Sequence, residues 1–271
     1  MPRSKRVYDF IMKTWPLSKV AFRLARRPLF SPFIQPFLSP RSNQATYIPI
    51  NEMISPPENV VLPQEILKPL LEQASTRFLM NECLCRTHEN CSNFPQDLGC
   101  IFLGDGAAKI SPTMGHPITP TEALDHVNQA VALGLLPLIV HTAFDAFTLN
   151  IPYNRMLTVC FCCDCCCGIR QGMRLGREAF WDIVQPLPGL KVEVTDDCLY
   201  CGTCVDECDI HALSLNHDRA VISSHCKGCG RCVEACPVGA ITLSIPENGF
   251  VQHNLMARIR EHTDIHPSGD R

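Results

Sequence analysis

Two cysteine runs in the C-terminal third of the sequence have the spacing that iron–sulfur chemistry needs. Each run reads Cys-x2-Cys-x2-Cys-x3-Cys, and the eight residues are Cys198, Cys201, Cys204, Cys208, Cys226, Cys229, Cys232 and Cys236. Three closely spaced thiolates can occupy three corners of a cubane [4Fe–4S] cluster, and the fourth, more distant cysteine ligates the other cluster. We therefore expect crossed ligation. One cluster would use Cys198, Cys201, Cys204 and Cys236, and the other Cys226, Cys229, Cys232 and Cys208.

Zinc is the main alternative for these cysteines, because two Cys-x2-Cys pairs can form a tetrahedral zinc site. A zinc ribbon does not need the third cysteine of each run or the Cys236-Pro237 ending. Disulfides are disfavoured as well, because iron–sulfur clusters need free thiolates as ligands and therefore a reducing compartment. The two runs therefore favour iron–sulfur clusters.

The segment 191–246, which carries both runs, is an internal repeat. A shift of 28 residues superposes the first run on the second. Each half is predicted to contain a strand, a cysteine loop, a short helix and a second strand. On these residues the segment resembles the bacterial two-cluster ferredoxins, and the resemblance implies two pseudo-symmetric halves with a cluster in each. Asp209 departs from the family pattern, which has proline after the fourth cysteine.

Ten further cysteines lie upstream of this segment, and their density does not fit an ordinary apolar core. They form two groups, which are Cys83, Cys85, Cys91 and Cys100, and then Cys160, Cys162, Cys163, Cys165, Cys166 and Cys167. We expect them to bind metal, as at least one additional iron–sulfur cluster. Joint use of the two groups would tie the start of this region to its end. The alternative for the first group is a set of buried free thiols, because cysteine also packs as a small apolar residue.

A wider resemblance covers residues 46–246. The order of a Cys-x-Cys-Arg motif, a helix ending in glycine, a dense cysteine run and a two-cluster segment is similar to an uncharacterised group of ferredoxin-domain proteins of anaerobes. The resemblance implies redox work with iron–sulfur clusters and no known substrate.

The rest of the sequence predicts an α+β protein whose cysteine-rich domain is mainly helical. Helices are expected over 64–77, 119–134 and 168–184, the second beginning with a capping box at Thr119 and Glu122 and ending at a glycine. Arginines at 170, 174 and 177 in the third helix could form a cationic face beside a cluster, or a solvated face. The expected organisation is a basic amphipathic arm (1–45), the mainly helical cysteine-rich domain (46–190), the two-cluster domain (191–246) and a tail with a short helix and a disordered end (247–271).

The charge of the chain is distributed unevenly. The 271 residues carry a net charge of −3, but residues 1–41 hold nine basic side chains and one acidic one, a net charge of +8. An amphipathic helix over Tyr8–Leu24, interrupted at Pro16, would suit an anionic membrane surface. The alternative is that it packs on its own domain or on a partner subunit. No nucleic-acid motif accompanies the arm.

The longest apolar run, Ala130–Val140, has 11 residues and is too short to span a bilayer. Charged residues interrupt any export signal near the N-terminus. We expect a cytoplasmic protein with peripheral contact at the inner face of the membrane.

The function that these features favour is electron transfer. Single electrons would pass through the two [4Fe–4S] clusters, and through at least one cluster in the N-terminal domain, to a redox partner protein or a larger redox complex. Two alternatives stay open. One is an oxidoreductase with a site-differentiated cluster acting on a small sulfur or disulfide substrate, and the other is a thiol relay that handles metal or sulfur. No catalytic residue can be assigned from the sequence.

Overall fold

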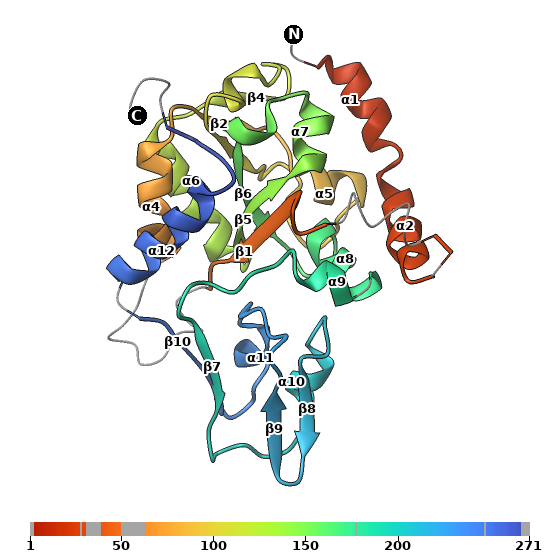
Figure 1. Ribbon diagram of the computed structural model, residues 1–271, viewed down its shortest axis with the longest axis vertical. Coiled ribbons are helices and arrows are strands. Elements are labelled where there is room, and N and C mark those ends of the chain that lie inside the picture. Colours follow the sequence, from red (N-terminus) through yellow and green to blue (C-terminus); the bar gives the residue numbers. More distant parts are fainter. Residues whose placement is uncertain are drawn as a thin grey trace.

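The computed structural model describes residues 3–27, 29–30, 39–49, 63–176, 178–246 and 248–266. Figure 1 shows a larger part built around one sheet and a smaller part below it. Both helices and antiparallel strands are present, so the α+β class is confirmed. None of the helices in the described ranges is long and apolar enough to cross a membrane.

A six-stranded antiparallel sheet forms the centre of the larger part, with the strand order β1-β5-β6-β3-β2-β4. Its strands are β1 (Asn43–Tyr47), β2 (Arg77–Met80), β3 (Ile101–Leu103), β4 (Gly115–Pro117), β5 (Leu136–Thr142) and β6 (Leu157–Cys162). Strands β5 and β6 pair from Leu136↔Cys162 to Val140↔Thr158. The last residues of β6 therefore carry the start of the dense cysteine run into the centre of the sheet.

The expectation of a mainly helical domain over residues 46–190 is not confirmed, because the sheet organises this part. All seven residues of β5 are buried. A strand buried on both faces does not alternate between apolar and polar residues, so its sequence resembles that of a buried helix. The expected boundary at residue 45 also falls inside β1, whose residues pair with β5.

Three helices pack together beside the sheet, and they share one hydrophobic core with it (Figure 1). They are α4 (Pro63–Gln73), α6 (Pro120–Ala132) and α12 (Asn248–Arg260). The capping box predicted at Thr119 and Glu122 is present at the start of α6, and Gly134 follows its end with φ +76°. Leu255 of α12 is 1% exposed. The expected tail is therefore part of the core, although its last residues, 267–271, lie outside the described range.

The remaining elements of the larger part are short. They are α5 (Leu84–His88), η5 (Ala107–Lys109), α7 (Ala143–Leu149), η6 (Tyr153–Arg155), α8 (Gly168–Leu175) and α9 (Glu178–Trp181). The helix predicted over 168–184 is thus divided after Gly176. A side chain at Gly168 would collide with Trp15, and one at Gly172 would collide with Phe180. These contacts explain why glycine recurs on one face of α8.

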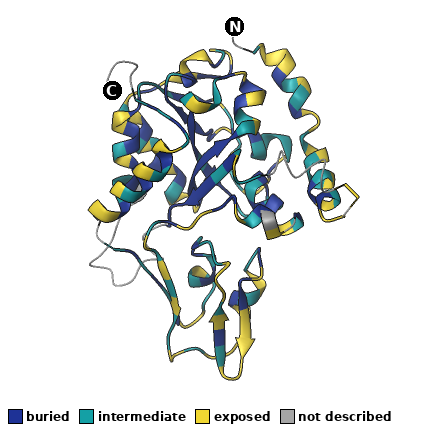
Figure 2. Cartoon of the chain, in the orientation of Figure 1, coloured by how far each residue is buried: buried dark blue, intermediate teal, exposed yellow. Residues whose placement is uncertain are grey.

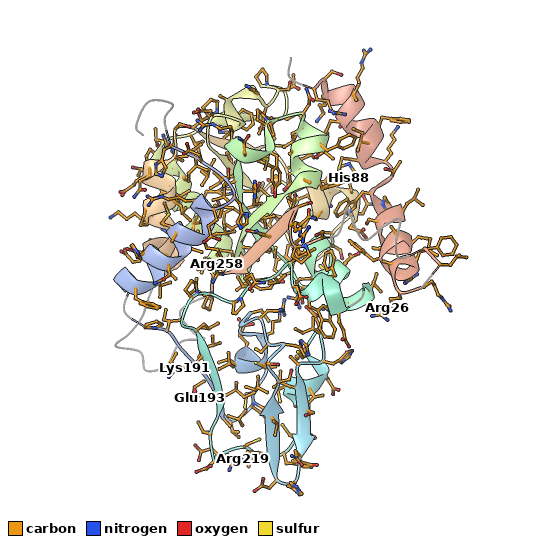
Figure 3. The ribbon with its side chains drawn as sticks, viewed as in Figure 1. Arg26, His88, Lys191, Glu193, Arg219 and Arg258 are labelled. Atoms are coloured by element: carbon orange, nitrogen blue, oxygen red, sulfur yellow. The ribbon has the colours of Figure 1, made fainter. Side chains whose placement is uncertain are left out.

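The N-terminal arm packs on the larger part through α1 (Lys5–Met12), η1 (Trp15–Leu17) and α2 (Ser18–Ala25). The two inward-facing side chains of α1, Tyr8 and Met12, are 1% exposed. Arg26 donates to the carbonyl oxygens of Arg174 and Gly176, at 2.9 and 2.7 Å, and so ties the arm to the end of α8 (Figure 3). The inner face of the arm therefore packs on the protein's own larger part. Figure 2 shows exposed residues along the outer face of α1.

The smaller part, 191–246, is a repeat in structure as well as in sequence. Its elements are β7 (Lys191–Val194), α10 (Thr203–Asp206), β8 (Leu213–Asn216), β9 (Arg219–Ile222), α11 (Arg231–Glu234) and β10 (Ile241–Ser244). The shift of 28 residues carries β7 onto β9, α10 onto α11 and β8 onto β10. Each half contains the predicted strand, cysteine loop, short helix and second strand. The strands pair between halves, β7 with β10 and β8 with β9, so neither half is complete alone.

Candidate iron–sulfur and metal sites

The eight cysteines of the smaller part line two separate cavities. One cavity is lined by Cys226, Cys229 and Cys232 of the second half together with Cys208 of the first. The other is lined by Cys198, Cys201, Cys204 and Cys236. We call these the inner and the outer cavity. The structure thus brings together the two sets that crossed ligation needs, three thiols from one half and one from the other. Ligation itself stays a prediction.

Backbone amides point at the thiols in a pattern that follows the repeat. The amide of Ala212 donates to Cys208 Sγ, and that of Ala240 donates to Cys236 Sγ, each at 3.2 Å. Gly202 and Gly230 precede α10 and α11 with φ +83° and +81°, which is a backbone conformation that glycine adopts without strain. Hydrogen bonds to ligating sulfurs are one of the means by which a protein sets the potential of a cluster.

The two cavities differ in their surroundings. Tyr47 of β1 and Met173 of α8 line the inner cavity, so it lies against the larger part. The outer cavity is bordered by Leu199 and Val238, whose exposed fractions are 65% and 44%, and by the exposed Cys201. One cavity therefore lies against the sheet domain, and the other lies near the surface, where Cys201 is exposed.

Asp209, the residue that departs from the ferredoxin pattern, joins the two parts of the molecule. Its carboxylate forms ion pairs with Arg170 and Arg174 of α8. The side chain of Arg170 is only 2% exposed, so the helix does not present a simple solvated face. Burial opposes the charge of Arg170, but Tyr47, Asp209, Cys229 and Cys167 outweigh this and raise its pKa. Of the other arginines predicted on this face, Arg177 lies outside the described residues.

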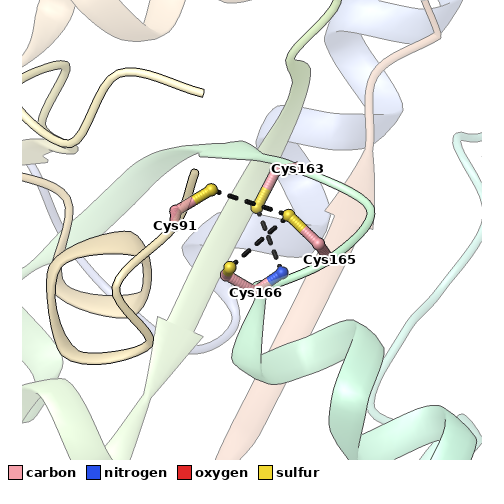
Figure 4. Close-up of side chains that lie close together, drawn as sticks. All are labelled: Cys91, Cys163, Cys165 and Cys166. Atoms are coloured by element: carbon pink, nitrogen blue, oxygen red, sulfur yellow. Dashed lines mark hydrogen bonds between the residues drawn. The ribbon is translucent and has the colours of Figure 1, made fainter. Parts of the chain in front are cut away.

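Four of the ten upstream cysteines form a compact set, which we call the four-thiol group. It consists of Cys91, Cys163, Cys165 and Cys166, whose sulfurs all lie within 4.8 Å of one another (Figure 4). The Cys165 sulfur is 3.6 Å from that of Cys91 and 3.4 Å from that of Cys166. The amide of Cys166 donates to Cys163 Sγ at 3.3 Å. The sequence grouping missed this set, because Cys91 is separated from its partners by more than 70 residues.

The other six interact with one another and form a second set, the six-thiol group, two members of which lie on β6. Its members are Cys83, Cys85, Cys100, Cys160, Cys162 and Cys167. The Cys162 and Cys167 sulfurs are 3.1 Å apart, and the hydrogen bond between them lowers the pKa of Cys167 to about 7. Hydrogen bonding to Cys100 raises the pKa of Cys83, and burial raises that of Cys85. Each set thus combines thiols from both groups predicted from the sequence: Cys91 joins three residues of the dense run, and Cys83, Cys85 and Cys100 lie with the other three.

A fully buried arginine, Arg86, interacts electrostatically with thiols of both groups. It donates through Nε to Pro95 O at 2.7 Å and through Nη1 to Phe161 O at 2.6 Å, and Nη2 donates to Leu98 O. Burial opposes its charge, but Cys83, Cys100, Cys163 and Cys162 raise its pKa. The sequence showed Arg86 only as a neighbour of the cysteines. Its burial depends on contacts made by distant segments.

We predict that Arg86→Met lowers the free energy of unfolding by about 3–5 kcal/mol, because three buried carbonyl oxygens lose their donor and the thiolates lose their counter-charge. It should also reduce the metal content of the larger part. Urea unfolding without air, followed by tryptophan fluorescence, and elemental analysis measure the two effects.

Arg77→Met is the matched control for this prediction. Arg77 also donates to three backbone carbonyls, those of Leu71, Ala74 and Ile118. It should lose stability but keep its metal. An Arg86→Met protein with a full metal content would contradict the role of Arg86 in metal binding by the surrounding thiols.

Comparison with known protein families gives a match in the second half of the repeat. A family model described as 4Fe-4S binding domain matches residues 220–242, which include Cys226, Cys229, Cys232 and Cys236. The first half, which contains Asp209, lies outside the match. No curated protein and no solved structure matches the chain. The matched motif and the cavities lined by cysteine together identify the chain as an iron–sulfur protein with at least one [4Fe–4S] cluster.

Proposed function

We propose that the protein transfers single electrons through two [4Fe–4S] clusters, one in each cavity of the smaller part. The proposal rests on which thiols line each cavity. Each combines three thiols of one half with the fourth thiol of the other half. A cubane with four thiolate ligands transfers one electron at a time, and the protein sets its potential and its access to partners.

The surroundings of the cavities suggest the path that electrons take. A cluster in the outer cavity would lie beside the exposed Leu199 and Val238, where a redox partner protein or a larger redox complex can approach. A cluster in the inner cavity would lie against Tyr47 and Met173 of the larger part. The two clusters would then connect the protein surface with the cysteine-rich interior.

We further propose that the six-thiol group holds an additional iron–sulfur cluster at the inner end of this path. Buried thiolates are costly unless positive charge compensates them, and metal ligation supplies it together with folding free energy. Four of the six, Cys83, Cys100, Cys162 and Cys167, are at most 7% exposed. This burial favours electron transfer over the oxidoreductase and relay alternatives, because a substrate must reach a thiol or an open iron, whereas an electron need not.

The crossed ligation predicts which variants share a phenotype. Cys236→Ser should damage the same cluster as Cys204→Ser, and Cys208→Ser the same cluster as Cys232→Ser, because each pair lines one cavity. Low-temperature EPR of the reduced variants, prepared without air, would give two pairs of matching spectra. Ligation within each half would instead make Cys236→Ser resemble Cys232→Ser.

The additional cluster predicts the iron content. Three cubanes require about twelve irons per chain and two require about eight. Wild-type protein prepared without air should therefore contain about twelve, and Cys100→Ser should contain about eight while keeping the EPR signals of the smaller part. A wild-type value near eight, with the six thiols titratable after unfolding, would leave a two-cluster protein and exclude this step of the path.

The outer face of the arm is a proposed contact with an anionic membrane surface. Phe10 and Leu17 are 72% and 63% exposed, and the basic side chains of Arg6 and Lys13 are exposed beside them. Apolar side chains that insert among lipid headgroups, together with basic ones, are the requirements for interfacial binding. The inner face does not contribute, since it is buried on the protein itself.

We predict that the double variant Phe10→Ser, Leu17→Ser loses most of its binding to vesicles that contain phosphatidylserine. Binding of the wild type should weaken with salt, because each basic side chain near the surface contributes about 1 kcal/mol. Sedimentation with vesicles measures both effects. Phe250→Ser, which changes a 52% exposed phenylalanine outside the arm, is the control. Equal binding of the wild type and the double variant would exclude this membrane contact.

A further inference from the structure

The four-thiol group has the dimensions of a site for one ion. Zn²⁺ binds thiolates at about 2.3 Å in a tetrahedron, which places the sulfurs about 3.8 Å apart. The distances of 3.4 and 3.6 Å, and the 4.8 Å limit on all pairs, bracket this value. The four ligands of a cubane bind four separate irons, so all four cannot lie this close to one another at once. Among the described residues, this is the only group of cysteine, histidine and carboxylate side chains that is compact enough for a single ion.

We propose that Cys91, Cys163, Cys165 and Cys166 bind one structural Zn²⁺ ion. Structural zinc sites have four protein ligands, whereas catalytic ones keep a position open for water. Cys91, Cys163 and Cys166 are between 1% and 7% exposed, and Cys165 is partly buried. The site is therefore closed and supports no substrate chemistry. This inference does not depend on electron transfer in the smaller part.

The protein around the four thiols is built to present them. Cys91 lies in the irregular segment between α5 and β3, and its amide donates to Arg86 O at 2.9 Å. Gln96 Nε2 donates to Cys91 O at 3.1 Å, and Gln171 Nε2 donates to Cys165 O at 3.2 Å. Such hydrogen bonds orient the residues that ligate a metal. They fix both segments that carry the thiols, the loop with Cys91 and the turn with Cys165.

An ion at this position would fasten two irregular segments to each other. The segment 89–100 has no helix or strand of its own, and 163–167 is a turn between β6 and α8. Neither segment has a long ladder of backbone hydrogen bonds to order it. Ligation by Cys91 on one side and by three residues of the turn on the other supplies folding free energy where the chain lacks it. Asp164, within the turn, also pairs with Arg231 of α11 at 3.4 Å, so the ordered turn contacts the smaller part.

The division of the ten cysteines has a direct consequence for metal content. Zinc would depend on one set of thiols and iron on the other, although members of the two sets are neighbours in sequence and in space. Cys91 belongs to the four-thiol group and Cys100 to the six-thiol group, yet each is 7% exposed. Substitution of either one therefore removes a thiol of equal burial from the same stretch of chain.

Elemental analysis of the full-length protein, produced with both iron and zinc in the medium and purified without air, tests the proposal. The wild type should contain one zinc per chain. Cys91→Ser should lose the zinc and keep its iron, and Cys100→Ser should keep the zinc. The proposal is overturned if Cys91→Ser loses about four irons and no zinc, or if the wild type contains no zinc and the four thiols are free or oxidised to a disulfide.

A measurement on the wild type keeps the test valid if Cys91→Ser does not fold. Zinc K-edge X-ray absorption of the native protein should show four sulfur neighbours at about 2.3 Å, without nitrogen or oxygen. A first shell that contains nitrogen or oxygen ligands would place the zinc elsewhere and overturn the assignment.

Discussion

The buried guanidinium of Arg86 is the constraint on which the larger part depends. An arginine without solvent is unfavourable unless hydrogen bonds and negative charge compensate it. Here the carbonyl oxygens of Pro95, Leu98 and Phe161 accept its hydrogen bonds, and thiols of both groups contribute to its electrostatic environment. The same hydrogen bonds fix the positions of α5, the loop that follows it and the end of β6 relative to one another. The segments that carry the thiols are thus brought together around one buried cation.

A second buried arginine repeats this arrangement where the two parts of the molecule meet. Arg170 pairs with Asp209, at the position where the ferredoxin pattern has proline. Cys167 and Cys229, from different thiol sets, both contribute to its electrostatic environment. A fixed cation favours the reduced, more negative state of a nearby cluster. Asp209 therefore has a structural role in this chain. Its pair with Arg170 anchors the inner cavity to the larger part and places positive charge between the two.

The parts of the fold that local patterns determine were predictable from the sequence. The 28-residue repeat predicted the elements of the smaller part, and the Thr119–Glu122 capping box predicted the start of α6. The sheet was not predictable in this way, because β3 and β4 have three residues each and β5 is buried throughout. The same limit applied to the four-thiol group. Cys91 is brought to its partners by the pairing of β3 with β6, and spacing along the chain does not report such contacts.

The smaller part is an insertion between α9 and α12 rather than a C-terminal appendage. The chain enters it after Leu190, and returns through α12, whose Leu255 is in the core of the larger part. Gln185 N donates to Ala45 O of β1 at 2.8 Å, and Arg258 of α12 donates to Pro186 O at 3.0 Å (Figure 3), so both ends of the insertion are fastened to each other and to the sheet. Attachment at two ends, with the Arg170–Asp209 pair between them, holds the inner cavity in place against the larger part.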